Sequence, residues 1–228
     1  MVHSAQQTDN SNRGTKGSNL IVRIYLVLGI FNPTYSLMKN LLCFFTFLLL
    51  SNLATAQMTM PDHIKEKMTY PVLDFAPWVG VVPISNAVMP YDPSLTYKIA
   101  IDVYGSLKDS TKIHEPFTEV ARTYNLFIAN GVPADKIKIA AVIHGGLSKA
   151  VVNNEAYRKK YGVDNPTLLA IQELKKVGVE FYLCGQSMSF LQILQEDVTP
   201  EVKVALSAKT SFVALDQMGY SFLDVSGN

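Results

Sequence analysis

The feature that most constrains the fold is an alternation of strand-like and helix-like segments from residue 97 onward. Runs of β-branched and aromatic residues, which are typical of strands, occupy 97–104, 136–143, 179–184 and 220–225. Between the first two, segment 115–130 repeats apolar residues three and four positions apart, as an amphipathic helix does. Strands alternating with helices build βαβ units, so we predict an α/β fold with a mainly parallel sheet and helices on both faces.

Start and stop signals place the remaining helices. We predict them over 148–160, 167–177, 188–196, 199–208 and 211–218. Pro166 and Pro200 suit the first turn of the helices that they open, and Gly178 and Gly219 suit helix ends. Segment 211–218 is ambiguous by propensity, and it is assigned as helix because Ser211 can cap its start.

Residues 38–56 have the three parts of a secretory signal peptide. Lys39 supplies the positive charge, 41–50 (LLCFFTFLLL) is apolar, and small residues Ala54 and Ala56 suit cleavage. The apolar run is shorter than the roughly 20 residues that span a bilayer. We predict cleavage after Ala56, a periplasmic or secreted protein, and no stable membrane anchor after cleavage.

The 37 residues that precede Met38 need a separate account, because a signal peptide begins at the N-terminus. We interpret 1–37 as an upstream extension of the reading frame, with translation starting at Met38. The alternative is that the first methionine is the true start and 20–50 form an anchor. Pro33 and Lys39 interrupt that stretch, which favours the first interpretation.

Removal of the leader changes what the composition implies. The mature chain keeps 172 of 228 residues, with 16 basic against 18 acidic ones and Cys184 as its one cysteine. A net charge of −2 argues against nucleic-acid binding, and one cysteine excludes a disulfide scaffold. The sequence has no GxGxxG, GxxxxGK[ST], HExxH or CxxC motif. We therefore expect no cofactor and no metal.

Residues 57–96 contain six prolines and keep no helical or alternating period for long. We predict an extended arm, in which 78–82 pairs as a short strand, ahead of a folded domain at 97–228. Aromatic residues such as Phe75 and Trp78 need a surface to cover. The arm is therefore expected to pack on the domain or on a neighbouring subunit.

Two chemically reactive side chains follow strand ends, where ligands bind in open α/β sheets. Cys184 ends the third predicted strand just before a helix, and the unpaired N–H groups of a helix start favour the thiolate. Gly185 would let the backbone approach a ligand, and Gln186 and Ser187 could donate hydrogen bonds to it. The alternative is an inert, buried cysteine.

His144 ends the second predicted strand and has the same ambiguity. It could hold a thiol as the thiolate or bind an anion, or it could be a hydrogen-bonded histidine in a glycine turn. Gly145 and Gly146 mark a tight turn whose N–H groups could form an anion-binding nest. The candidate catalytic residues are therefore Cys184 and His144, and the candidate ligand-binding residues lie in the two loops that follow them.

Several short motifs together resemble the DsrE-like family, of the DsrE, DsrF and TusD type, and its exported branch in particular. They are IHGG (143–146), NP (165–166), FYLCGQS (181–187), DVTP (197–200) and GY (219–220). The resemblance covers 97–225. It implies a three-layer α/β/α sandwich with a five-stranded, mainly parallel sheet, and assembly into trimers or hexamers.

The resemblance also implies a function. DsrE and TusD carry sulfur as a persulfide on a cysteine, so we hypothesise that Cys184 accepts sulfane sulfur and passes it to a thiol or sulfur-carrier partner. An exported protein departs from these members, because sulfur relay to tRNA is cytoplasmic work. The alternative hypothesis is a non-catalytic module that binds a small ligand or serves as an oligomeric scaffold.

Overall fold

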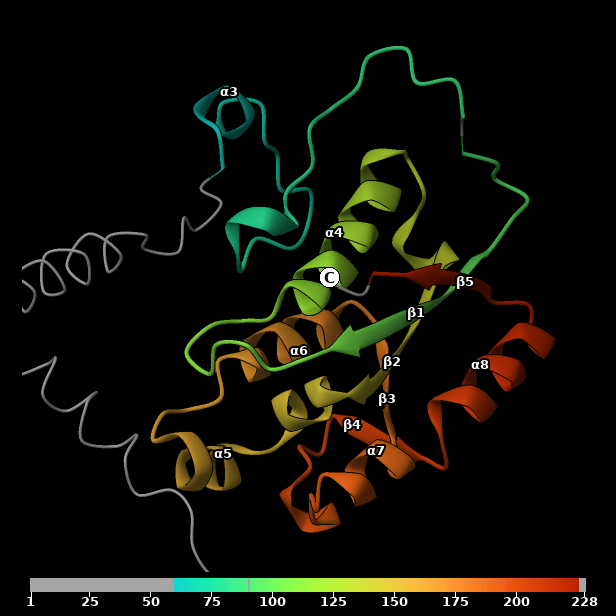
Figure 1. The fold of residues 1–228 in the computed structure, drawn as a ribbon. Helices are drawn as coiled ribbons and strands as arrows, with labels where there is room; N and C mark the ends of the chain where they lie inside the picture. Colours follow the sequence, from blue (N-terminus) through green and yellow to red (C-terminus); the bar gives the residue numbers. More distant parts are fainter. Residues whose placement is uncertain (1–59, 90, 226–228) are drawn as a thin grey trace, which may run out of the picture. The chain divides into compact units, whose positions relative to one another are not determined.

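Five strands form one parallel sheet in the computed structural model, which describes residues 60–89 and 91–225 (Figure 1). The strands are β1 (Tyr97–Gly105), β2 (Ile137–Gly145), β3 (Glu180–Cys184), β4 (Val202–Ala205) and β5 (Ser221–Asp224). Their order is β4-β3-β2-β1-β5, and every pairing is parallel. The predicted α/β fold with a five-stranded, mainly parallel sheet is therefore confirmed.

Helices cover the two faces of the sheet unequally. The main helices are α4 (Glu115–Ala129), α5 (Asn154–Tyr161), α6 (Thr167–Lys176), α7 (Gly185–Phe190) and α8 (Ala208–Gln217). Strands β1, β2, β3 and β4 lie side by side in chain order, so each connection moves to the next strand in the same direction across the sheet. Because crossovers between parallel strands are right-handed, α4 and α6 lie on the same face. The chain returns across the sheet to β5, which puts α8 on the opposite face (Figure 1).

The face under α4 and α6 holds the larger part of the core. Alternate residues of β1, namely Ile99, Ile101 and Val103, pack there with Phe181 and Leu183 of β3. All five side chains are buried. Because side chains alternate across a strand, the residues between them point to the α8 face.

The α8 face carries smaller side chains and a smaller buried cluster. Ala100 and Ala140 lie there with Val142, Cys184 and Leu215. Alanines fill little of the space between the sheet and its covering helix, so this face has room for a cavity.

The helix predicted over 199–208 is wrong, because Val202–Ala205 is the edge strand β4. It pairs with β3 from Phe181 opposite Val202 to Cys184 opposite Ala205. Thr199 and Pro200 form a turn in which the N–H of Val202 donates to the carbonyl of Thr199. The unpaired edge of β3 offers backbone hydrogen bonds that outweigh a weak local helix signal.

The boundaries of three other predicted helices move. Segment 148–160 is divided into the 3-10 helix η3 (Gly146–Val151) and α5, because Val152 pairs with Val198 between them. Instead of starting near 188, α7 begins at Gly185, and it is followed by η4 (Gln195–Asp197). The predicted last helix exists, but it is capped by Ser207, whose side chain accepts from the Thr210 N–H, rather than by Ser211.

The described part of the N-terminal segment packs against α4. It contains α3 (Asp62–Lys65) and the 3-10 helix η1 (Pro77–Val79), so the short strand expected over 78–82 is reduced to one bridge between Thr69 and Val81. Buried Asn125 of α4 receives the Leu73 N–H and donates to the carbonyls of Leu73 and Val79. These bonds hold the segment on the domain.

The predicted extension at 1–37 and the predicted signal peptide at 38–56 lie outside the described residues. Within the part of the chain that is described, no helix has the length and apolar character needed to cross a membrane.

Candidate functional site

Cys184 stands at the junction of β3 and α7. It is the last residue of the strand and also the N-cap of the helix, where its Sγ accepts the Ser187 N–H at 3.5 Å. The side chain is only 5% exposed. Sequence reasoning placed the cysteine before a helix, and the structure brings that helix directly against the sulfur.

The environment of the thiol favours its ionised form. Burial raises the pKa of Cys184, but hydrogen bonds from Ser187 and from the backbone N–H groups of Ala208 and Gln186 outweigh it. The net effect is a pKa below the ordinary value of a cysteine. A thiolate fraction above that of a free cysteine at neutral pH follows, and the thiolate is the nucleophilic form.

The thiol opens into a cavity of about 700 Å³ on the α8 side of the sheet. The cavity is lined by Asp102, His144, Cys184, Gln186, Ser187, Phe190, Leu206, Ser207, Ala208, Lys209, Phe212 and Phe222. Parallel strands bring their carboxyl ends to one edge of a sheet, which is how residues far apart in sequence meet here. The two candidate catalytic residues, Cys184 and His144, therefore share one cavity.

Asp102, which the sequence did not point to, lines the cavity together with Cys184 and His144. Asp102 of β1 lies with its Oδ1 2.7 Å from Nε2 of His144, and both residues line the cavity. The ring of Tyr104 stacks on His144, with 4.7 Å between ring centroids. The available signal was a single charged residue inside the otherwise apolar end of a strand, IAIDVY.

This contact assigns the nitrogens of His144. With Nε2–H donated to the carboxylate of Asp102, Nδ1 is the ring nitrogen that keeps its lone pair and can accept a hydrogen bond. His144 and Asp102 therefore form one hydrogen-bonded pair beside the cavity that Cys184 also lines.

The loop residues predicted to bind ligand divide into two groups. Gln186 and Ser187 line the cavity. Ser187 Oγ accepts the Gly145 N–H at 3.0 Å, which ties α7 to the end of β2. A side-chain carbon at Gly185 would lie 2.8 Å from the Ala205 carbonyl oxygen, so glycine is needed there for α7 to pack against β4.

Gly145 is the last residue of β2 and Gly146 begins η3, and neither lines the cavity. Gly145 adopts a positive φ of 63°, and a side-chain carbon there would meet the ring of Tyr104. At Gly146 it would lie 2.9 Å from the carbonyl oxygen of Gly105. The anion-binding nest at these glycines stays a prediction. Among the described residues, no cluster of His, Cys, Asp and Glu is suited to hold a metal ion.

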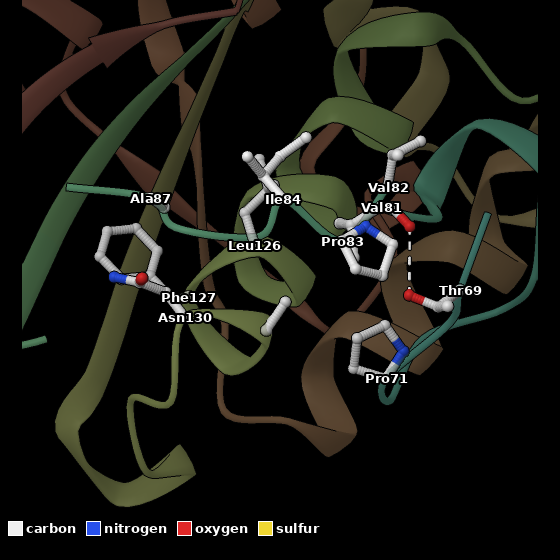
Figure 2. Close-up of a pocket in the computed structure, with 11 residues that line it drawn as sticks. Thr69, Pro71, Val81, Val82, Pro83, Ile84, Ala87, Leu126, Phe127 and Asn130 are labelled. Atoms are coloured by element: carbon white, nitrogen blue, oxygen red, sulfur yellow. Dashed lines mark hydrogen bonds between the residues drawn. The ribbon is translucent and has the colours of Figure 1, made fainter. Parts of the chain in front are cut away.

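A second cavity, of about 610 Å³, lies between the N-terminal segment and α4 (Figure 2). Its walls include Pro71, Pro83, Ile84, Leu126 and Phe127. The hydrogen bond drawn in Figure 2, which the Thr69 hydroxyl donates to the Val81 carbonyl, joins two residues of the cavity wall. None of the residues that line it has a side chain that ionises near neutral pH, which sets it apart from the cavity at Cys184.

Fold and site together define an α/β protein with a buried thiol of lowered pKa at the carboxyl edge of a parallel sheet. Residues 111–225, half of the chain, match the model of the DsrE/DsrF-like family. The chain belongs to this family, and the resemblance drawn from its short motifs is confirmed.

Comparison with individual proteins gives a solved structure. The chain is similar to a protein of unknown function, MTH1491 from Methanobacterium thermoautotrophicum, with 16% sequence identity and a TM-score of 0.40. The similarity covers 56% of this chain and 98% of that chain. Among curated proteins, none matches the sequence.

Proposed function

We propose that this protein carries sulfane sulfur as a persulfide on Cys184 and delivers it to a thiol or sulfur-carrier partner. The observation that carries the proposal is the lowered pKa of a thiol that opens into a cavity of about 700 Å³. Membership of the DsrE/DsrF-like family supports a role in sulfur chemistry. His144 and Asp102 line the same cavity, so His144 is available to accept the proton that the Cys184 thiol releases.

The chemistry needs no oxidant or reductant. The Cys184 thiol gives its proton to His144, and the thiolate attacks the sulfane sulfur of the donor. A bond forms between Sγ and that sulfur while the bond from the sulfur to the donor breaks, and the electron pair leaves with the donor group. The proton held on His144 then neutralises the leaving group or the new persulfide.

Exposure of the native protein to polysulfide tests this function. We expect the intact mass to increase by one sulfur atom in the wild type and to stay unchanged in Cys184→Ser. Prior alkylation with iodoacetamide should block the gain, because it consumes the same thiol. A native Cys184 that resists alkylation at neutral pH would contradict the proposal.

The hydrogen bonds to the thiol supply a second test. Ser187→Ala removes one contribution that lowers the Cys184 pKa, so the pH at which alkylation reaches half its maximal rate should rise. Ser189→Ala, on the exposed side of the same helix, is the matched control and should leave that pH unchanged. Equal profiles for both variants would show that Ser187 does not activate the thiol.

We further propose that the protein assembles as a homo-oligomer, a trimer or hexamer. The support is a group of exposed large apolar residues after η1: Ile84, Val88 and Met89 are 71%, 96% and 82% exposed. The alternative function, a non-catalytic ligand-binding or scaffold module, would use the same apolar surface for assembly. Sedimentation should give a multiple of the monomer mass that falls in a Val88→Ser, Met89→Ser double variant, and a monomeric wild type would refute assembly.

We also propose export, with a mature chain that begins at Gln57. The support is the basic start, apolar run and small residues of 38–56. Mass analysis of protein recovered from a cell fraction outside the cytoplasm should give Gln57 as its first residue. A cytoplasmic chain that retains 38–56 would overturn this assignment.

A further inference from the structure

The cavity at Cys184 is much larger than the sulfur atom that it would receive. A volume of about 700 Å³ lies within the range of pockets for small organic ligands, roughly 300–1,000 Å³. Such pockets are mostly apolar, with a few polar groups that fix orientation. A cavity of this size can hold the molecule that donates the sulfur, and the residues that line it indicate the chemistry of that donor.

Aromatic and aliphatic side chains form the outer wall. Phe190 and Phe222 are 87% and 60% exposed, and Leu206 is 73% exposed. Phe212 lies behind them, edge-on to both Phe222 and His144, at centroid distances of 5.1 Å and 6.4 Å. When an apolar ligand covers large apolar side chains that are exposed to water on the rim of a cavity, the burial of their surface favours binding.

The charges of the lining argue against an anionic inorganic donor. Lys209 is the one lysine or arginine among the lining residues, and Asp102 is their one carboxylate, so their formal charges cancel. Inorganic polysulfide and thiosulfate are dianions, and sites for such ions normally gather several cations. The N–H groups of Ser187, Ala208 and Gln186 at this site are directed at the Cys184 sulfur.

We infer that the sulfur donor of this site is a small organic persulfide, R–S–S–H, in which R is an uncharged apolar or aromatic group. This inference rests on the proposed function of Cys184. The apolar group lies against the phenylalanine rings, while the outer sulfur reaches the thiol at the inner end of the cavity.

The step balances as a sulfur transfer. The Cys184 thiolate attacks the outer sulfur, the S–S bond of the donor breaks, and R–S⁻ leaves with the electron pair. R–S⁻ then takes the proton that His144 accepted from the thiol. The net change converts Cys184–SH and R–S–S–H into Cys184–S–S–H and R–S–H, and the apolar thiol departs.

The persulfide test compares two donors at equal concentration. Benzyl persulfide should load Cys184 about tenfold faster than inorganic polysulfide or more, because burying one aromatic ring is worth at least that factor. The measurement is the rate of the one-sulfur mass gain. Loading by polysulfide at an equal or higher rate would overturn the inference and leave the proposed function intact, whereas no loading by either donor would contradict the function itself.

An alkylation test measures the apolar preference without any sulfur transfer. N-benzyl iodoacetamide should outpace iodoacetamide at Cys184, relative to the same ratio on a free thiol in water. Phe190→Ala and Phe222→Ala, both exposed and tolerable to folding, should each lower that ratio severalfold. Leu169→Ala, which truncates an apolar residue 48% exposed on α6 outside the cavity, is the control. A ratio near one in the wild type, or equal ratios in all variants, would refute the apolar subsite.

Discussion

The same strands present different chemistry to the two faces of the sheet. On β1, Ile99, Ile101 and Val103 point into the core under α4 and α6, while Ala100 and Asp102 between them face the α8 side. One face is filled by large branched side chains, and the other pairs small residues with a few polar groups around a cavity. The comparison indicates that stability and chemistry are divided between the two faces.

The division has a physical cause. A well-packed apolar face contributes most of the hydrophobic stabilisation and leaves no space for a ligand. In the part of the chain that the structure describes, α8 leaves the opposite face partly uncovered, since Phe222 and Leu206 remain exposed and Cys184 borders a cavity. The looser packing on this side leaves the sulfur of Cys184 beside a cavity.

The largest expected effect comes from truncating the packed face. Phe181→Ala removes a fully buried ring and should lower the free energy of unfolding by about 3–5 kcal/mol. Phe222→Ala on β5, where the ring is 60% exposed, should cost less than about 1 kcal/mol. Urea denaturation followed by Trp78 fluorescence measures both. Equal losses would mean that the two faces stabilise the fold alike.

A substitution on the cavity face should alter reactivity more than stability. Asp102→Asn removes the carboxylate that accepts the Nε2–H of His144. If His144 takes the thiol proton as we propose, alkylation of Cys184 at neutral pH should slow about tenfold, and its pH profile should change shape. The free energy of unfolding should change by under about 1 kcal/mol. Asp216→Asn, on the exposed side of α8, is the control. An unchanged pH profile in Asp102→Asn would separate Asp102 from the chemistry.

The smallest expected effect is a pH dependence of stability that arises on the packed side. Burial lowers the pKa of His114 below 6.5, and the charge of Asp109 only partly offsets it. A lowered pKa means that protonation favours the unfolded chain, so this contribution to stability is lost as pH falls below about 6.5.

Urea midpoints between about pH 7 and pH 5 measure that contribution. The decline should be smaller in His114→Asn than in the wild type, whereas His63→Asn, at an exposed position in α3, should match the wild type. A decline of the same size in all three proteins would assign the pH dependence to other groups.

Local patterns predicted much of this architecture. β-branched runs found β1, β2, β3 and β5, and the apolar period of 115–130 found α4, because these elements follow their local propensities. The edge strand β4 was not predicted, because its strand conformation depends on hydrogen bonds with β3 and not on a strand pattern in its own residues. The early start of α7 was missed too, since Cys184 is an unusual cap.

The candidate site was predicted only in part. Cys184 and His144 were found because each ends a strand. Asp102 was not found, because its partner lies 42 residues away in the sequence and meets it only when β1 and β2 pair. The phenylalanines of the cavity were missed for the same reason, since they come from α7, α8 and β5.

The sequence by itself determined the class of fold, the family and the position of a thiol at a strand end, because these depend on residue order along the chain. The tertiary structure decided which side chains surround that thiol. Strand order and the right-handed return of the chain to β5 place Asp102, His144 and the aromatic rings on one face. Such proximity depends on long-range pairing, which no local pattern encodes.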